Sequence, residues 1–164
     1  MKIYCPANPI RDKRDVFCRL TFANDADRKR FAMGENFRGQ PLSAPLLQPY
    51  EVKRSTEFPG GDAAPLGDRQ AIGINTDPMA LSQQALNALL PQIDQLVQVV
   101  PLLFDEGEYA LLNVLNVVDA LVPQTPARAF VTDCFVQLVQ QAGLTGFEFE
   151  ELWSDELMAQ EAGS

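Results

Sequence analysis

The sequence contains no histidine among its 164 residues, and this absence removes most routes to catalysis. Serine and cysteine nucleophiles are commonly activated by a neighbouring histidine, and zinc sites are commonly built from histidine and closely spaced cysteine. The carboxylates that are present do not have the spacing of two acids that face each other across a cleft. We therefore expect that the chain is not an enzyme and that it has no catalytic residue, no metal and no other cofactor.

Cysteine is scarce as well. Cys5, Cys18 and Cys134 form no Cys-x-x-Cys pair, and their odd number does not suit a disulfide framework. We expect Cys18 in a strand and Cys134 on the apolar side of a helix, and all three cysteines as reduced, buried structural thiols. A bridge between Cys5 and Cys18 is the alternative.

Long hydrophobic runs are also missing. The longest apolar stretch, residues 109–122, is interrupted by Asn113, Asn116 and Asp119, whereas a membrane-spanning helix needs about 18 or more consecutive apolar residues. We interpret these three polar residues as hydrogen-bonded strand-end or turn positions. Residues 1–15 lack the apolar segment of a secretory signal. The sequence thus predicts a cytoplasmic protein with no membrane partner.

Basic residues are few after position 60. Residues 1–60 carry eleven Lys and Arg against seven Asp and Glu, whereas residues 61–164 carry two against fifteen, which together give the net charge of −9. Such a surface repels nucleic acid over most of its area and attracts basic proteins at long range. We therefore expect a basic protein partner and no direct binding of nucleic acid. Solubility alone is the alternative explanation of this charge.

What is present indicates one domain, residues 1–164, of the α+β class. We expect an antiparallel or mixed sheet packed by two or three helices. The predicted strands share runs of β-branched and aromatic residues or apolar alternation: residues 1–5, 16–22, 50–54, 71–74, 96–104, 109–118, 129–131 and 147–150. The predicted helices begin after capping residues: a short one at residues 24–27, and longer ones over residues 78–90, 132–142 and 155–162.

Several local signals are specific. Asp77 and Pro78 suit the start of the second helix, Leu81 lies on its apolar face, and Pro91 suits its end. Pro101 predicts an edge position or a bulge for its strand. The acidic turn at residues 105–108 predicts an antiparallel hairpin. Gly143 has the position of a helix C′ residue.

Two segments carry a family resemblance. GEYALLNVLNVVDAL (residues 107–121) and FVTDCFVQLVQQAGLTGFEFEELW (residues 130–153) resemble the eleventh family in the numbered series of bacterial polymorphic-toxin immunity proteins. The similarity extends through the Pro-Leu-Gly-Asp segment at residues 65–68 and the helix after Leu81-Ser82, so that it covers residues 65–153. The basic N-terminal part, residues 1–60, matches the family poorly. One departure is the short connection between Asp119 and Phe130, where the family usually carries a longer insertion.

The resemblance implies an immunity protein that neutralises a cognate secreted toxin, with a nuclease as one toxin class that the acidic charge suits. It places the protein in interbacterial competition, in systems such as type VI secretion, where it acts as an antitoxin in the producing cell. An adaptor or chaperone for a secreted effector is the alternative function.

The acidic residues of the family-like part are the predicted toxin-binding site: Asp105, Glu106, Glu108, Glu148, Glu150, Glu151, Asp155 and Glu156. They form one patch if the hairpin and the last strand share a sheet. Residues 24–37 and 58–68 are the alternative binding surface, because immunity proteins diverge where they contact their toxins.

Overall fold

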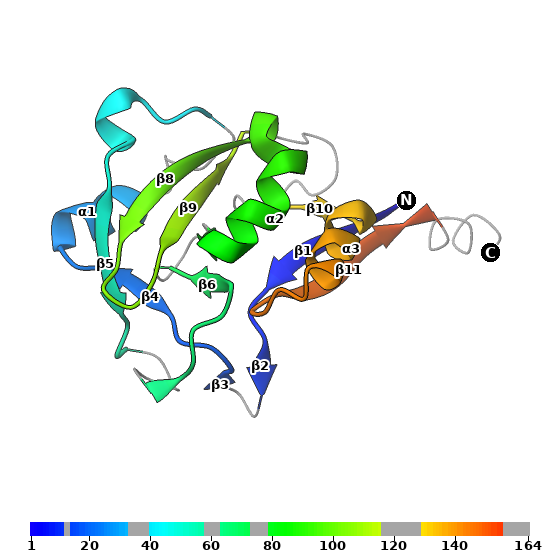
Figure 1. Cartoon of the computed structure of the whole chain (residues 1–164), viewed down its shortest axis with the longest axis horizontal. Helices are drawn as coiled ribbons and strands as arrows, with labels where there is room; N and C mark the ends of the chain where they lie inside the picture. Colours follow the sequence, from blue (N-terminus) through cyan, green and yellow to red (C-terminus); the bar gives the residue numbers. More distant parts are fainter. Residues whose placement is uncertain (12–13, 33–39, 58–62, 73–78, 116–128, 156–164) are drawn as a thin grey trace.

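A curled six-stranded sheet forms the larger part of the fold in the computed structural model, which describes residues 1–11, 14–32, 40–57, 63–72, 79–115 and 129–155 (Figure 1). The strands follow the order β4 (Leu20–Phe22), β5 (Tyr50–Arg54), β8 (Val97–Leu103), β9 (Tyr109–Val114), β7 (Met79–Ser82) and β6 (Arg69–Ala71). Of these neighbours, β5 and β8 run parallel and the other pairs run antiparallel. Leu20 also forms a bridge with Ile72. The two edges of the sheet therefore meet at this point, and the sheet curls like a partly closed barrel.

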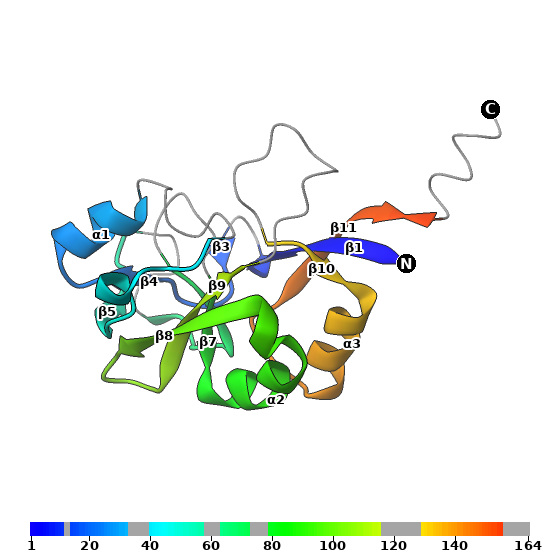
Figure 2. The same ribbon diagram turned by 90° about the horizontal axis from the view of Figure 1, so that it is seen from above.

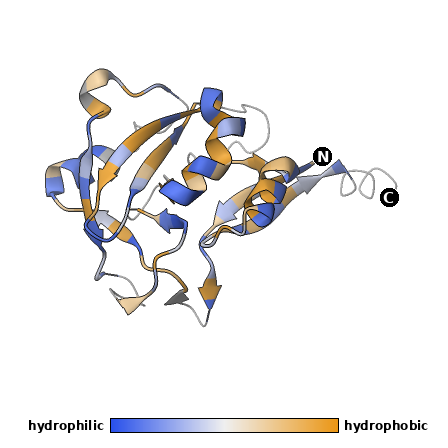
Figure 3. Cartoon of the chain, in the orientation of Figure 1, coloured by the Kyte–Doolittle hydropathy of each residue, from blue (hydrophilic) through white to orange (hydrophobic). Residues whose placement is uncertain are grey.

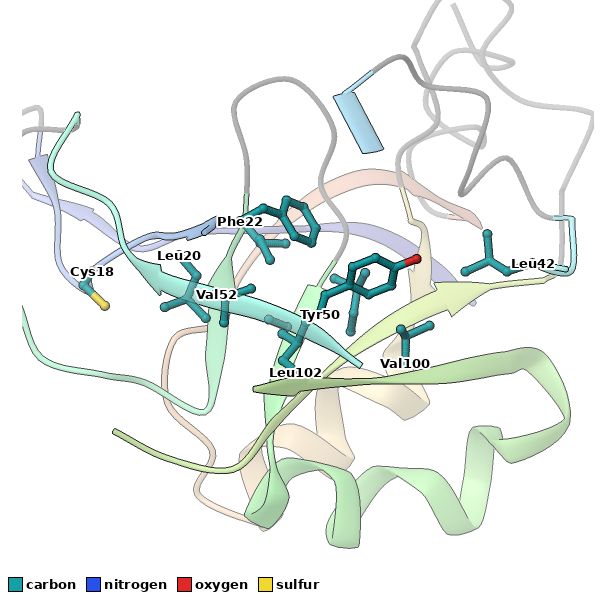
Figure 4. Packing of buried hydrophobic residues seen from close by; sticks show 11 residues of the cluster. Cys18, Leu20, Phe22, Leu42, Tyr50, Val52, Val100 and Leu102 are labelled. Atoms are coloured by element: carbon teal, nitrogen blue, oxygen red, sulfur yellow. The ribbon is translucent and has the colours of Figure 1, made fainter. Parts of the chain in front are cut away.

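The concave side of this sheet encloses the first hydrophobic core (Figure 4). Tyr50 and Val52 point inward from β5 and are 1% and 4% exposed, whereas Glu51 and Lys53 between and after them are exposed. This is the alternation expected of a strand with one buried face. The ring of Phe22 meets Tyr50 edge to face at 5.9 Å, an arrangement that favours this pair.

Two helices cover part of the convex side and form the second core with it. These are α2 (Gln83–Ile93) and α3 (Asp133–Gln141). Their apolar faces pack on the outward side chains of β7 and β9, which include Met79, Leu81 and Leu112. Because Ala80 and Leu111 point into the first core, both strands are buried on both faces.

A separate antiparallel sheet joins the two ends of the chain beside α3 (Figure 2). It contains β10 (Val131–Thr132), β1 (Lys2–Ala7) and β11 (Glu148–Ser154), in that order. The rings of Phe147 and Phe149 stack on each other and meet Phe135 of α3 edge to face. Glu148 and Glu150 alternate with these two phenylalanines along the chain and are exposed, as the sequence predicts for this strand.

The remaining elements are short. Strands β2 (Ile10–Arg11) and β3 (Arg14–Asp15) form a hairpin, and α1 (Asp25–Ala32) follows β4. Single 3₁₀ turns lie at η1 (Ala44–Leu46) and η3 (Asp94–Leu96). The side chain of Asn24 accepts a hydrogen bond from the Asp27 N–H at 2.8 Å, which confirms the predicted cap of α1.

The predicted α+β class, with a mixed sheet packed by helices, is confirmed. The hairpin around residues 105–108 is confirmed by the pairing of β8 with β9. The end of α3 is confirmed as well: Gly143 has φ +63°, and the Leu144 and Gly143 N–H groups donate to the carbonyls of Val139 and Gln140. These two bonds are those of a Schellman motif.

Three predictions about the helix and strand positions are wrong. Residues 79–82 form β7 and not the first turns of a helix, and α2 begins after Ser82, whose hydroxyl accepts from the Ala85 N–H at 3.1 Å. A strand buried on both faces reads as a continuous apolar run and resembles a buried helix. Pro91 lies within α2 and does not end it, because the Asp94 N–H still bonds to the Leu90 carbonyl. The predicted start at Asp77 and Pro78 lies outside the described residues.

The third concerns Pro101. Strand β8 is an interior strand, but its ladder with β5 involves only Leu102 and Leu103. A proline before that point interrupts no pairing on the β5 side, so that an interior strand tolerates it.

Some predicted positions differ in smaller ways. The strand expected over residues 16–22 is shorter, because only Leu20–Phe22 pairs with β5. Cys134 is exposed and does not lie on the apolar side of α3, although Cys5 and Cys18 are buried and none of the three cysteines is in a disulfide. Asn116, Asp119 and the predicted helix after Asp155 lie outside the described residues.

Candidate protein-interaction site

The predicted acidic residues occupy two sheets, and the structure does not bring them into one patch. Asp105 and Glu106 form the turn between β8 and β9, and Glu108 directly precedes β9. The second group lies in the other sheet: Glu148, Glu150 and Glu151 are part of β11, and Asp155 comes directly after it. Figures 1 and 2 show the turn and β11 toward opposite ends of the longest axis. The condition for a single patch is therefore not met. Glu156 lies outside the described residues.

In the turn, Glu106 is bound by an arginine. Its carboxylate accepts hydrogen bonds from Nε and Nη2 of Arg54 at 2.7 to 2.9 Å. The hydrogen bond from Arg54 lowers the pKa of Glu106. Arg54 also donates from Nη1 to the Ala64 carbonyl at 2.6 Å. Arg54 therefore ties the turn to β5 and to the loop before β6. Asp105 and Glu108 are the exposed carboxylates of the turn for which no ion pair forms with a described residue.

On β11 the acids near the chain end are paired too. Glu151 lies 2.9 Å from the Lys2 ammonium, and Asp155 contacts the α-amino group of Met1. Both pairs are surface pairs, which contribute little to stability. They do reduce the negative charge that a partner meets there. Glu148 and Glu150 form no ion pair with a described residue, and they lie on the face of β11 away from Phe149.

A different cluster of polar residues, which the sequence reasoning did not connect, links the two parts of the fold. The Asp68 carboxylate accepts from the Ser82 hydroxyl at 2.7 Å, the Thr145 N–H at 2.8 Å and the Thr145 hydroxyl at 2.9 Å. The Arg69 N–H donates to the Thr145 carbonyl at 3.0 Å. We call Asp68, Ser82 and Thr145 the clasp, because it ties the edge of the six-stranded sheet to the loop between α3 and β11.

The carboxylate of the clasp is tuned by opposing effects. Burial raises the pKa of Asp68, but the hydrogen bonds from Thr145 and Ser82 together lower it further than burial raises it. The carboxylate is thus ionised at neutral pH, and its charge strengthens the bonds that it accepts. In this arrangement Asp68 accepts bonds from its own chain, so we assign it a structural role.

The segment before Asp68 is held equally firmly. The Gly67 carbonyl accepts from the Tyr109 hydroxyl at 2.8 Å and from Nε2 of Gln70 at 3.0 Å. The Cys18 thiol lies 3.8 Å from Oε1 of Gln70. Burial raises the pKa of Cys18 and of Tyr109. A thiol with a raised pKa carries little thiolate at neutral pH, so this cluster suits packing better than nucleophilic chemistry.

The described residues contain no group of three or more Cys, Asp and Glu side chains placed to hold a metal ion. None of the helices seen in that part of the chain is both long and apolar enough to cross a membrane. Asn113 is the next-to-last residue of β9 and is fully buried. Its amide donates to the Gln40 carbonyl and to Gln98, which confirms the expected hydrogen-bonded position at a strand end.

No family model matches the chain, and no curated protein matches it.

Proposed function

We propose that this chain is an immunity protein, which binds a cognate secreted bacterial toxin in the cytoplasm of the producing cell and neutralises it by stoichiometric inhibition. The observation that carries the proposal is the clasp. Its three members come from three of the segments that resemble the immunity family: Pro-Leu-Gly-Asp ending at Asp68, Leu-Ser ending at Ser82, and Ala-Gly-Leu-Thr-Gly around Thr145.

These segments are far apart in sequence, and the bonds between Asp68 and Thr145 span 77 positions. Similarity by chance has no reason to fall on residues that contact one another. Family-like segments that meet in one hydrogen-bond cluster are expected where the similarity reflects a shared fold. The clasp therefore supports the family resemblance, and the resemblance supplies the function.

The charge supports the chemistry of the partner. The net charge is −9, and exposed carboxylates lie both in the β8–β9 turn and on β11. Such charges speed the encounter with a basic protein and disfavour acidic competitors. A basic toxin is thus the partner that we propose, and neither a nucleic acid nor a membrane is needed for binding.

The experiment starts with a pull-down from the native host, in which mass spectrometry identifies the protein captured by the tagged wild-type chain. The captured protein is then produced in a host without a secretion system, with and without this chain. We expect it to be toxic alone and harmless when both are present. An adaptor would instead affect export and give no protection in that host.

A titration separates binding from turnover. We expect the toxin activity to fall linearly and to end sharply near a small integer ratio of the two proteins. Full protection by this chain at a dose far below equimolar would contradict stoichiometric inhibition.

A further inference from the structure

The convex side of the six-stranded sheet is covered over β9 and β7 but open over β8. Val99 and Leu103 point outward and are 38% and 57% exposed, and Pro101 between them is exposed as well. The register places Val99 beside Leu112 and Pro101 beside Ala110 on β9. These two neighbours are 2% and 5% exposed in the core formed with the helices. One continuous apolar surface therefore passes out from beneath α2 onto β8.

The figures agree with this description. In Figures 1 and 2 the C-terminal part of β8 extends beyond α2, and Figure 3 shows hydrophobic residues along that part of the strand. We call Val99, Pro101 and Leu103 the β8 stripe.

Acidic residues border the β8 stripe. Glu51 is the register partner of Leu103 on β5 and lies on the same face of the sheet, where it is exposed. Asp105 and Glu108 are exposed in the turn that follows Leu103. Lys53 is the exposed basic residue on the same face of β5. An apolar centre with a charged border is the usual anatomy of a protein–protein interface.

The acidic residues of β11 have little exposed apolar surface beside them. Their strand exposes one large apolar side chain, Leu152, at 39%. The charges of Glu151 and Asp155 are opposed there by Lys2 and the α-amino group. A basic partner thus finds less apolar surface on β11 than at the β8 stripe, and two of the four acids there already have a cationic partner.

We propose that the β8 stripe, bordered by Glu51, Asp105 and Glu108, is the surface on which the basic partner docks. This inference rests on the proposed function and names its binding face. Burial of the stripe slows dissociation, and the acidic border speeds association. A second copy of this chain is a poor occupant, because a two-fold contact would place the same acidic border opposite itself.

The first test changes the apolar centre. The probe is the partner captured by the wild-type chain in the pull-down, purified and measured by surface plasmon resonance. We expect the double variant Val99→Thr/Leu103→Asn to raise the Kd about tenfold or more, mainly through faster dissociation. The matched control Leu152→Asn, at an exposed leucine of β11, should leave the Kd unchanged. Thermal unfolding of all three proteins checks that each variant folds.

The second test changes the border by neutralising two charges at either site. Asp105→Asn/Glu108→Gln should slow association severalfold at low salt and weaken its salt dependence. Glu148→Gln/Glu150→Gln alters the net charge equally and should slow association less.

The outcomes separate the two proposals. If a wild-type chain that binds and neutralises the partner is weakened by the β11 variants and not by the β8 variants, the docking face is wrong and the proposed function stands. If the wild-type chain binds no basic partner, both fail. If the wild-type chain self-associates in sedimentation velocity and Val99→Thr/Leu103→Asn does not, a second copy covers the stripe and the proposed docking face is wrong.

Discussion

Gly146 and Gly143 form a natural pair for testing how the clasp loop is packed. Both have a left-handed backbone, with φ +83° and +63°. A Cβ at Gly143 would meet nothing within 4 Å. A Cβ at Gly146 would overlap the carbonyl oxygen of Arg69 and lie 3.1 Å from the backbone nitrogen of Arg69. Alanine at the two positions thus costs the same kind of backbone strain, and only one of the two adds a steric conflict.

The expected magnitudes follow from this difference. Gly143→Ala should lower the free energy of unfolding by about 1 kcal/mol, the cost of the left-handed conformation for a residue with a Cβ. Gly146→Ala must also displace Arg69, whose N–H bonds to the Thr145 carbonyl at 3.0 Å. The obstacle is backbone and not the flexible end of a side chain. We therefore expect a total loss of about 3 kcal/mol or more, in the range of severe single substitutions.

Urea unfolding followed by circular dichroism at 25 °C measures both losses, with the m-value as a check that unfolding stays two-state. For a domain of this size, the corresponding decreases in Tm are about 2–4 °C for Gly143→Ala and about 6–12 °C for Gly146→Ala. If Gly146→Ala loses no more stability than Gly143→Ala, then the contact with Arg69 is not tight and the reasoning is refuted.

Two further predictions concern pH and thiol reactivity. Because the hydrogen bonds hold the pKa of Asp68 below its ordinary value, its contribution to stability is fully present above about pH 4 and is lost as the pH falls through the folded-state pKa. Asp68→Asn should therefore lower the free energy of unfolding by about 1–3 kcal/mol at pH 7, and an equal difference in strong acid would contradict this. For the thiols, Ellman's reagent should modify the exposed Cys134 rapidly in the native protein, and the buried Cys5 and Cys18 only after unfolding. A denatured, non-reduced sample with fewer than three reactive thiols would reveal a disulfide instead.

The elements that could be read from the sequence are those set by neighbours along the chain. The β8–β9 hairpin follows from two apolar runs around an acidic turn, and α3 ends where Gly143 supplies the left-handed conformation. The alternation at residues 147–150 likewise identified which side chains face the second core. Each of these signals acts over a few residues, so no tertiary information is needed to interpret it.

The failures occur where burial or pairing depends on distant segments. Met79–Ser82 reads as helix because a strand with apolar neighbours on both faces has no alternation, and only its pairing with β6 and β9 distinguishes it. The acidic site failed for a similar reason. The hairpin and β11 each followed from local patterns, but their sheets are assigned by pairing partners far away in the chain.

The charge of −9 and the lack of histidine can be read directly from the chain, and so can the type of most local elements. Three features instead depend on the tertiary structure: β1 pairs with β11, Asp68 contacts Thr145, and α2 leaves the β8 stripe open. Each of these features depends on contacts between segments that are far apart in the sequence. Short-range patterns of residue type do not specify which distant segments pack together.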